Sequence, residues 1–528
     1  MKTPIVSLVG TRLLPGRATT LVEAFLGLTD RIGPWLHVGP ALAPRVYTGP
    51  QVVEEARRWR RALQEAGVRP HDRVAVILPN DERFIGAFFG TMLAGATPIP
   101  LSWPVSGLDA AKKLEGIRPL VEAADVRAVA TDEAFVGCFE RPVVTTPASR
   151  GEGVDILPDA RDPAFLQYTS GSLGKPRGAV ITQRAAMTCV YAMGQGLGFS
   201  EADVGLSWLP LFHDMGLVGG LFCPVVYGFP LHLMAPGEFL LHPARWLTRA
   251  AAVRATIAAA PDFAWRLCAR RVTRFEGDLS AWRVALDGAE PVHRTTLDAF
   301  CERFGPHGFR PESLRPAYGL AENTLAVCCS PGQRAEDDSV VGTRSIPSTG
   351  GPLPGVEVRI VDAHGANLRE GEEGEILVRS GSLMSGYFRD ERASAEALRD
   401  GWLHTGDLGV VTKGALHVSG RVKELVIQNG RKFHPYDIER VAADAVDAKL
   451  AGAAAWSIPG VDGEQLVVAV EASAAFHDGA EKTVRGAVLE ALGVRIDHVR
   501  VVAPGSLPRT TSGKVRRTEV ARMEHVGV

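Results

Sequence analysis

Several features are scarce in this chain of 528 residues, and each absence excludes a class of protein. Positive and negative charges nearly cancel, with 58 Lys and Arg against 60 Asp and Glu. No strong field for nucleic acid or for an anionic membrane is therefore expected. The seven cysteines include no Cys-x-x-Cys pair, which disfavours a disulfide scaffold and a zinc site. A reducing, cytoplasmic setting is favoured instead.

Long apolar runs are also missing. A membrane helix needs ~20 continuous apolar residues. The longest stretch without Asp, Glu, Lys or Arg lies between Asp214 and Glu238, and Pro and Gly interrupt it. We predict a buried strand-turn-strand passage there. The N-terminal segment, with Pro4 and Arg12, is too broken for a secretory signal. We therefore expect a soluble protein with no membrane insertion and no nucleic-acid partner.

Lysine is the third scarce feature, because only ten of the 58 basic residues are Lys. A Lys is thus the minority choice at any basic position. Lys514 ends the segment Thr-Thr-Ser-Gly-Lys and is followed at once by Arg516 and Arg517. A compact point charge on a flexible stem is one reason to keep Lys at such a place, since Arg cannot replace it equally. The alternative is chance.

The pattern of apolar residues indicates an α/β fold with more than one domain. Hydrophobic residues make up 46% of the chain, which allows a large core. Helices and strands alternate in the first part, whereas alternating apolar residues after about 350 predict antiparallel strands, as in a small barrel. A final unit from about 420 reads as α+β. The expected early elements are a helix over 52–67, a strand over 72–79, a helix over 82–96 and a strand over 126–131.

Seven motifs combine residues that can bind phosphate, carboxylate or an aromatic ring. The first is a loop rich in Gly, Ser and Thr whose N–H groups can converge on an anion. It is not a Walker A loop, because Pro176 stands where a second Gly is required. A surface hairpin is an equal alternative for this loop, and a buried structural histidine is the commoner explanation for His213. The motifs are 168–178, 208–217, 287–291, 317–324, 401–409, 420–439 and 507–514.

Taken together and in this order, the motifs resemble those of the adenylate-forming superfamily. Acyl-CoA ligases, fatty acyl-AMP ligases and peptide-synthetase adenylation domains belong to it. The resemblance covers essentially the whole chain, and LQYTSGS, WLPLFHDMGL and HPYDIE are similar to the fatty acyl-AMP ligase branch. It implies two α/β subdomains and a β-barrel-like subdomain within 1–419, capped by a mobile α+β domain of residues 420–528. The active site would lie in the cleft between them.

The resemblance also implies ligands and residue roles. A hydrophobic carboxylic acid and Mg-ATP would give an acyl-adenylate, and the acyl group would pass to coenzyme A or to an acyl carrier protein. Tyr318 would lie against adenine, Asp407 and Arg421 would face the ribose, and Lys423 would be the hinge. The implied catalytic residues are Lys514, His213, Glu322 and Thr169, of which Glu322 and Thr169 would hold Mg²⁺. The implied nucleotide-binding residues are Thr169, Ser170, Gly171, Ser172, Gly174, Lys175, Asp287, Gly288, Ala289, Tyr318, Gly319, Asp407, Arg421 and Lys423.

The phosphate loop departs from the family pattern. Leu173 replaces a Thr, and Arg177 replaces a Lys. Losing one hydrogen bond to a charged group costs about 1.5–3 kcal/mol, so ATP use would be weakened. A stronger hypothesis is that the enzyme takes a ready-made acyl-adenylate from a separate adenylating enzyme and performs the thiol transfer alone. Asp287 and Asp262 stand where Asn is commoner, with an effect on specificity whose direction the sequence does not give.

The second departure is a length. Fatty acyl-AMP ligases usually carry an insertion after the 317–324 motif that restrains domain rotation and prevents CoA use. Here Glu322 and Gly350 are only 28 positions apart, which favours an acyl-CoA ligase. Carrier-protein loading, thiol transfer alone and a non-catalytic nucleotide or acyl sensor stay open as alternatives. The acyl pocket would be built from 208–240 and 258–268, whose aromatics are Trp208, Phe212, Phe222, Phe229, Phe263 and Trp265.

Overall fold

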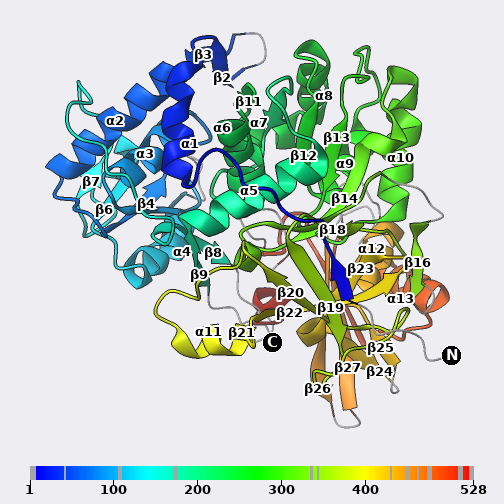
Figure 1. Cartoon of the computed structure of the whole chain (residues 1–528). Helices are drawn as coiled ribbons and strands as arrows, with labels where there is room; N and C mark the ends of the chain where they lie inside the picture. Colours follow the sequence, from blue (N-terminus) through cyan, green and yellow to red (C-terminus); the bar gives the residue numbers. More distant parts are fainter. Residues whose placement is uncertain are drawn as a thin grey trace.

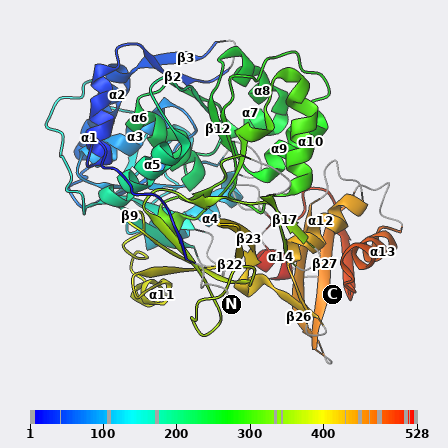
Figure 2. The same ribbon diagram turned by 45° about the vertical axis from the view of Figure 1, so that its right-hand side comes forward.

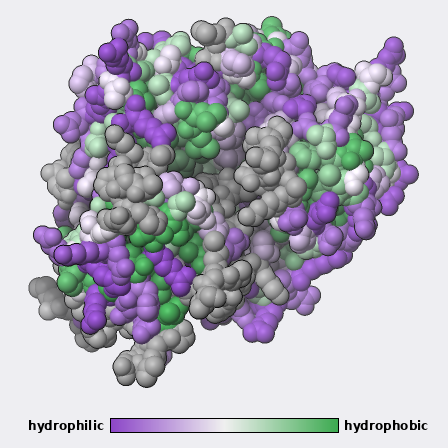
Figure 3. All heavy atoms as spheres, turned by 180° about the vertical axis from the view of Figure 1, so that it is seen from behind, coloured by the Kyte–Doolittle hydropathy of each residue, from purple (hydrophilic) through white to green (hydrophobic). Residues whose placement is uncertain are grey.

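The chain folds into parallel sheets covered by helices, an antiparallel sheet and a smaller C-terminal unit (Figure 1). Among the residues that this computed structural model describes, no helix combines the length and the apolar character needed to cross a membrane. Hydrophilic residues dominate the rim of the face seen from behind (Figure 3). The described residues are 7–40, 43–104, 110–169, 176–332, 337–341, 344–428, 431–446, 452–460, 463–472, 479–508, 515 and 517–522.

The first parallel sheet has the strand order β5-β4-β6-β7 and confirms the early expected elements. The helix over 52–67 begins slightly earlier, because Thr48 and Gln51 form a capping box before it. This helix packs on the next one, and both lie on the left in Figure 1. The elements are α2 (Gly49–Glu65), β4 (Arg73–Ile77), α3 (Glu82–Leu93), β5 (Thr97–Pro100), α4 (Ala110–Ala123), β6 (Ala128–Thr131), β7 (Val143–Val144), β8 (Pro163–Thr169) and β9 (Arg177–Thr182).

The second sheet has nine strands in the order β18-β15-β14-β13-β12-β10-β11-β2-β3. Its central strands, from β14 to β2, are parallel, so their carboxyl ends meet at one edge. Helices α8, α9 and α10 lie beside this sheet, at the upper right of Figure 1. The strands are β2 (Pro34–Val38), β3 (Arg45–Thr48), β10 (Gly205–Ser207), β11 (Leu231–Leu233), β12 (Ile257–Ala260), β13 (Val284–Asp287), β14 (Leu314–Gly319), β15 (Ala326–Cys329) and β18 (Gly351–Pro352). The helices are α1 (Leu21–Leu26), α5 (Gln183–Leu197), α7 (Pro236–Leu241), α8 (Pro243–Ala252), α9 (Asp262–Arg271) and α10 (Arg294–Phe304).

The prediction of a strand-turn-strand passage between Asp214 and Glu238 is wrong in its first half. Residues Met215–Phe222 form a π-helix that continues into α6 (Cys223–Tyr227). Pro224 does not break it, because it falls in the first turn of α6, where its missing N–H is no loss. Gly228 ends α6 in the left-handed conformation, and only β11 follows as a strand.

The alternating pattern after about 350 forms a six-stranded antiparallel sheet, which corresponds to the expected barrel-like subdomain. Among the described residues this sheet is open, because its edge strands β1 and β21 do not pair with each other. Residue Arg421 still belongs to this sheet, opposite Asp407. The elements are β1 (Ser7–Val9), β19 (Val356–Val361), β20 (Gly374–Ser380), α11 (Glu391–Ala397), β21 (Leu398–Arg399), β22 (Trp402–Thr412) and β23 (Ala415–Arg421).

The C-terminal unit has an apolar core of its own that begins at Val426. It lies at the lower right of Figure 2, beside the rest of the chain. As predicted, the unit is α+β, with helices packed on a three-stranded sheet. Its elements are β24 (Val426–Gln428), β25 (Arg431–Phe433), α12 (Pro435–Ala445), β26 (Ala453–Gly460), β27 (Gly463–Glu471), α13 (Ala480–Leu492), β28 (His498–Val502) and α14 (Arg517–Arg522).

Trp246 on α8 lies at the centre of a cluster of aromatic rings. It is 0% exposed, and its ring centroid lies 5.1 Å from that of Trp265 and 5.2 Å from that of Trp282. We expect Trp246→Ala to lower the free energy of unfolding by about 3–5 kcal/mol, because it leaves a cavity among these rings. Urea unfolding measures the loss. Leu241→Ala is the control, since Leu241 is 74% exposed and should change stability by less than about 0.5 kcal/mol. A similar small effect at Trp246 would contradict the packing argument.

Candidate active site

A cavity of about 520 Å³ lies at the carboxyl ends of the central parallel strands. Segments after β10, β13 and β14 form one side of it, and residues of the antiparallel sheet form the other. Open α/β sheets bind ligands at this edge. Of the residues expected from the sequence, the cavity is lined by Thr169, His213, Gly288, Ala289, Tyr318, Gly319, Glu322 and Arg421.

Part of the expected site lies outside the described residues. The predicted site residues concerned are Ser170, Gly171, Ser172, Gly174 and Lys175 of the phosphate loop, together with Lys514. Leu173 lies outside them too, and so does the side chain of Lys423. Their roles stay predictions. The two ends of the loop are described: Thr169 closes β8, and Arg177 opens β9 opposite it.

Tyr318, Asp407 and Arg421 form one hydrogen-bonded group on the cavity wall. The Tyr318 hydroxyl donates to Asp407 Oδ2 at 2.7 Å, and Arg421 Nε donates to Asp407 Oδ1 at 3.0 Å. Burial and the neighbouring Asp407 carboxylate raise the pKa of Tyr318 well above its usual range. The charge of Asp407 likewise raises the pKa of Arg421. The expected adenine-facing ring and ribose-facing carboxylate are therefore tied together before any ligand enters.

Glu322 lies across the same cavity and accepts a hydrogen bond from Tyr387. The Tyr387 hydroxyl lies 2.8 Å from Glu322 Oε1. Burial raises the pKa of Glu322, and the hydrogen bond from Tyr387 opposes that rise. The guanidinium of Arg177 lies over the Tyr387 ring, 5.3 Å from its centroid, and pairs with Asp390 at 3.5 Å. Arg177 thus positions Tyr387, which in turn binds Glu322.

The turn that carries Glu322 is strained and is held by its neighbours. Thr324 has a φ of +64°, which is rare for a β-branched residue. Its hydroxyl donates to the Ser382 carbonyl at 2.6 Å, and Asn323 Nδ2 donates to the Ala326 carbonyl at 2.8 Å. The hydroxyl and amide of the 317–324 motif therefore have structural roles, and the carboxylate is the part that faces the cavity. Backbone strain held in this way is typical of functional sites.

Asp287 lies directly behind the cavity wall. Its side chain is 0% exposed, and neither carboxyl oxygen has a hydrogen-bond partner. The adjacent Leu286, Gly288 and Ala289 line the cavity in its place. Burial raises the pKa of Asp287 well above its usual range, and the charges of Asp262 and Glu290 raise it further. Asp287 is therefore a sealed carboxyl group whose surroundings favour its neutral form.

His213 lines the large cavity together with Phe212 and Asp214. Its Nδ1 atom is 2.6 Å from Asp214 Oδ1. The preceding carbonyl, of Phe212, accepts a hydrogen bond from Gln167 Nε2 at 2.9 Å, which ties this segment to β8. The imidazole thus faces the cavity and is not enclosed in a core.

A second, smaller apolar cavity of about 40 Å³ lies beside the large one. The two share Met193, Met215, Leu286 and Leu325. Its walls include Gly219 and Gly220 of the π-helix, and Phe199 and Phe229 also line it.

The expected acyl-pocket aromatics separate into three groups. Phe212 lines the large cavity and Phe229 lines the small apolar one. Trp208, Phe263 and Trp265 pack in the cluster around Trp246. Phe222 belongs to the main core. Only two of the six named aromatics therefore line these cavities, and small residues such as Gly219 and Gly220 shape the rest.

The donors at the polar end suit a hard cation. The carboxylate of Glu322 and the hydroxyl of Thr169 line the same cavity. Within the described part of the chain, no three His, Cys, Asp or Glu side chains gather as a complete metal site. This arrangement fits Mg²⁺, which is usually held by one or two carboxylates together with substrate phosphates and water.

Sequence reasoning missed Tyr387, Glu375 and Thr405, although all three line the cavity. Glu375 Oε1 accepts from the Gly406 N–H at 3.1 Å, and Thr405 Oγ1 accepts from the Asp407 N–H at 3.0 Å. Tyr387 follows Gly386, whose φ is +147°. An aromatic residue after a glycine in a turn was the available signal, and it is a weak one.

We expect Asp287→Asn to stabilise the protein increasingly as pH rises. The folded pKa of Asp287 lies above its unfolded value of about 4. Above that value the unfolded chain releases a proton that the folded chain keeps, so stability is lost as pH rises toward the folded pKa. Removing the carboxyl group should gain about 1–3 kcal/mol at about pH 8 and little at about pH 4. Urea unfolding at several pH values measures the difference.

Asp262 supplies the matched comparison for that series. Burial, and next the charge of Glu290, raises its pKa to about 7, but it accepts hydrogen bonds from the His293 N–H and the Thr296 hydroxyl, each at 2.9 Å. Asp262→Asn breaks these contacts and should therefore stabilise less than Asp287→Asn at every pH. Parallel stability curves for the wild type and Asp287→Asn would contradict a proton held on Asp287.

Comparisons with known proteins agree with this geometry. Residues 40–388 match the family described as AMP-binding enzyme. A protein of Caulobacter vibrioides provisionally named an acyl-CoA synthetase is 32% identical over 509 residues, covering 88% of each chain. A medium-chain-fatty-acid–[acyl-carrier-protein] ligase of Moorena producens is 30% identical over 523 residues, covering 88% of this chain and 87% of its own.

The solved structures point the same way. One from a study of the fatty acyl-adenylate ligases of E. coli and L. pneumophila superimposes with a TM-score of 0.87. It is 29% identical and covers 97% of this chain and 99% of its own. The family match spans more than half of the chain. The chain therefore belongs to the family of AMP-binding enzymes, and its fold is that of the adenylate-forming ligases.

Proposed function

We propose that this chain is an acyl-CoA ligase, which makes an acyl-adenylate from a hydrophobic carboxylic acid and ATP and then transfers the acyl group to coenzyme A. The observation that carries the proposal is that a polar and an apolar cavity lie side by side and share Met215 and Leu286. Glu322, Tyr318 and Arg421 line the polar cavity, and Asp407 binds the last two. A nucleotide and an apolar tail would thus meet at His213.

The two half-reactions assign a place to each group. In the first, a carboxylate oxygen of the acid attacks the α-phosphorus of ATP, and the bond to pyrophosphate breaks. In the second, the thiol sulfur attacks the acyl carbon, the thiol proton is lost, and AMP leaves. We assign to Lys514 the stabilisation of charge on the α-phosphate. Mg²⁺, held by Glu322 and Thr169, would neutralise charge on the phosphate oxygens.

Asp407 would bind the ribose while keeping its present partners. Each of its carboxylate oxygens accepts one hydrogen bond, from Tyr318 or from Arg421. A carboxylate oxygen has two lone pairs, so each oxygen can accept one ribose hydroxyl in addition. Tyr318 would then pack against adenine with its hydroxyl still bound. Gly288, Ala289 and Gly319 would supply the backbone walls of the adenine pocket.

We propose that 1–419 is the N-terminal domain and 420–528 the mobile C-terminal domain, with Lys423 as the hinge. The separate core that begins at Val426 supports this division. Alternation between two poses would let one cleft perform both half-reactions. We also place the enzyme in the cytoplasm, a proposal supported by its seven free thiols.

Two observations bear on the acceptor. The short segment between Glu322 and Gly350 supports CoA, since beyond strand β15 its described residues form the small hairpin of β16 (Ser339–Val341) and β17 (Arg344–Ile346). The similarity to a carrier-protein ligase of Moorena producens supports the second candidate, an acyl carrier protein. The acceptor arm would be the same chemical group in both, a pantetheine thiol.

We expect the purified protein, given Mg-ATP, CoA and a panel of hydrophobic acids, to form acyl-CoA detected by mass spectrometry. Acids with short apolar tails should be preferred over long ones, because the apolar cavity beside the large one is small, about 40 Å³. Lys514→Ala should lose adenylate formation by about a hundredfold or more. Product formed with a carrier protein but never with CoA would contradict CoA as the acceptor. Unchanged chemistry in Lys514→Ala would favour the alternative of a non-catalytic sensor.

We expect Leu173→Thr to raise pyrophosphate exchange by about tenfold, because it restores one hydrogen bond to a charged group. Transfer from a supplied acyl-adenylate to CoA should stay unchanged. Arg177→Lys is the comparison variant, and it should lower exchange, since it weakens the contact with Tyr387. A wild type that makes acyl-CoA only from supplied adenylate, with no gain in Leu173→Thr, would show that the first half-reaction is lost for another reason.

A further inference from the structure

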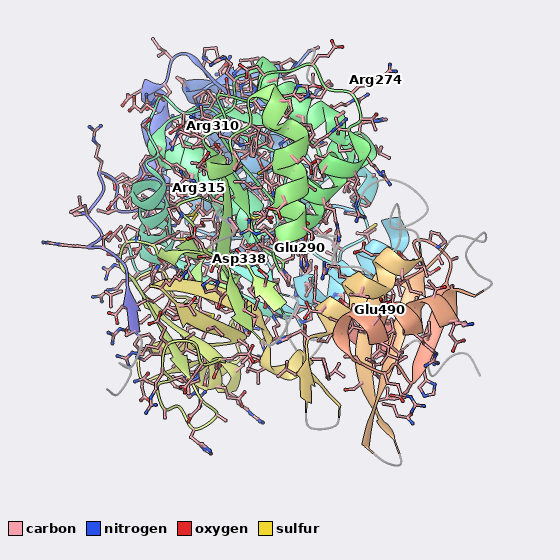
Figure 4. All side chains as sticks on the ribbon, turned by 90° about the vertical axis from the view of Figure 1, so that its right-hand side faces the viewer. Arg274, Glu290, Arg310, Arg315, Asp338 and Glu490 are labelled. Carbon is pink, nitrogen blue, oxygen red and sulfur yellow. The ribbon has the colours of Figure 1, made fainter. Side chains whose placement is uncertain are left out.

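One group of polar contacts joins the large unit to the C-terminal unit and has no role in the site described above. We call it the docking contact, and it consists of Glu290, His293, Tyr436 and Arg517. Glu290 follows β13 and lies at the side of the large unit that faces α12, as Figure 4 shows. Tyr436 lies in the first turn of α12, and Arg517 begins α14.

Glu290 is held in place by one unit and reaches the other. The Phe263 N–H donates to Glu290 Oε1 at 2.5 Å, which fixes the carboxylate against α9. The Tyr436 hydroxyl donates to Glu290 Oε2 at 3.1 Å. The rings of His293 and Tyr436 also stack, with centroids 5.7 Å apart. The Glu290 carboxylate thus accepts one hydrogen bond from each unit.

Tyr436 also connects this contact to Arg517. The Arg517 guanidinium lies 5.4 Å from the centre of the Tyr436 ring. It donates to Glu439 Oε1 at 2.5 Å and to Oε2 at 2.7 Å, the bidentate geometry that suits arginine. Its third contact is with Glu424 Oε2, at 2.5 Å. Glu424 lines the large cavity, so Arg517 joins α14 to the residue of the C-terminal unit that reaches the cavity.

The docking contact has a consequence for the cavity. It holds α12 against the large unit through Glu290 and Tyr436, and Glu424 of the same C-terminal unit lines the large cavity. The pose that the docking contact stabilises is therefore the one in which Glu424 forms part of the cavity wall.

We propose that Tyr436 is a positioning residue for the adenylation half-reaction. Its hydroxyl, bound by Glu290, docks α12 on the large unit, and its ring packs against Arg517, which binds Glu424. This inference rests on the proposed two-step function. It predicts that weakening the docking contact slows adenylate formation and spares transfer from a ready-made adenylate to the thiol, which requires the units to part.

The test is Tyr436→Phe, which removes the hydroxyl and keeps the ring that contacts His293 and Arg517. We expect kcat/KM for pyrophosphate exchange to fall by about tenfold, the effect of one hydrogen bond to a charged group. Transfer from a supplied acyl-adenylate to CoA should stay within about twofold. Glu290→Gln should act in the same direction, and the double variant should be no worse than the more affected single one, because both remove one interaction.

Asp444→Asn is the matched control. It lies on the same helix and pairs with Arg270 across the same interface, at 3.3 Å between exposed side chains. Exposed pairs contribute little, so both half-reactions should stay within about twofold. Equal losses in both half-reactions for Tyr436→Phe, or effects of Tyr436→Phe and Glu290→Gln that simply multiply, would overturn the proposal.

Hydrogen exchange of the full chain separates this proposal from the proposed function. We expect faster exchange in α12 for Tyr436→Phe and Glu290→Gln but not for Asp444→Asn. Unchanged exchange would overturn the docking role whatever the activities. A wild type inactive in both half-reactions would refute the proposed function and the positioning role with it, while the exchange rates would still show whether Glu290 and Tyr436 dock α12.

Discussion

The Asp407 carboxylate is the group on which the cavity depends, because it joins three parts of the fold. It lies on β22 of the antiparallel sheet and binds Tyr318 at the end of the parallel strand β14. It also binds Arg421, the last residue of β23. A buried carboxylate is costly unless it is bonded, and these two donors satisfy it. One group therefore fixes the relative positions of two sheets and of the chain that leaves them.

A second set of carboxyl groups lies at the ends of β12 and β13, where not every carboxyl group has a hydrogen-bond partner. Asp262 and Glu290 both accept hydrogen bonds, whereas Asp287 between them has none. The parallel strands bring these acids together because their carboxyl ends share one edge. The same edge forms the wall of the cavity and the face that docks α12. The fold thus places a buried carboxyl group without hydrogen-bond partners beside the cavity and the face that docks α12.

The sequence predicted the elements with strong periodicity, and eight of the site residues expected from the resemblance line the cavity. Helices α2 and α3 and strands β4 and β6 are long or strongly apolar, so local pattern decides them. The helical passage after Asp214 was missed because Pro and Gly predict turns, whereas here Pro224 starts a helix and Gly228 ends it. The partners of Glu322 and Asp407 were missed for another reason. Tyr387 is 65 positions from Glu322, and no local pattern records such a contact.

Arg177 shows how a departure from the family pattern acquires a meaning in the folded chain. As a replacement for Lys in the phosphate loop, it reads as neutral drift in an arginine-rich protein. In the structure its guanidinium lies over Tyr387 and pairs with Asp390. A planar guanidinium stacks on a ring better than an ammonium group does. Because Tyr387 binds Glu322, Arg177 supports the carboxylate that we assign to Mg²⁺. Of the two changes in the loop, it is therefore Leu173, and not Arg177, that can weaken the use of ATP.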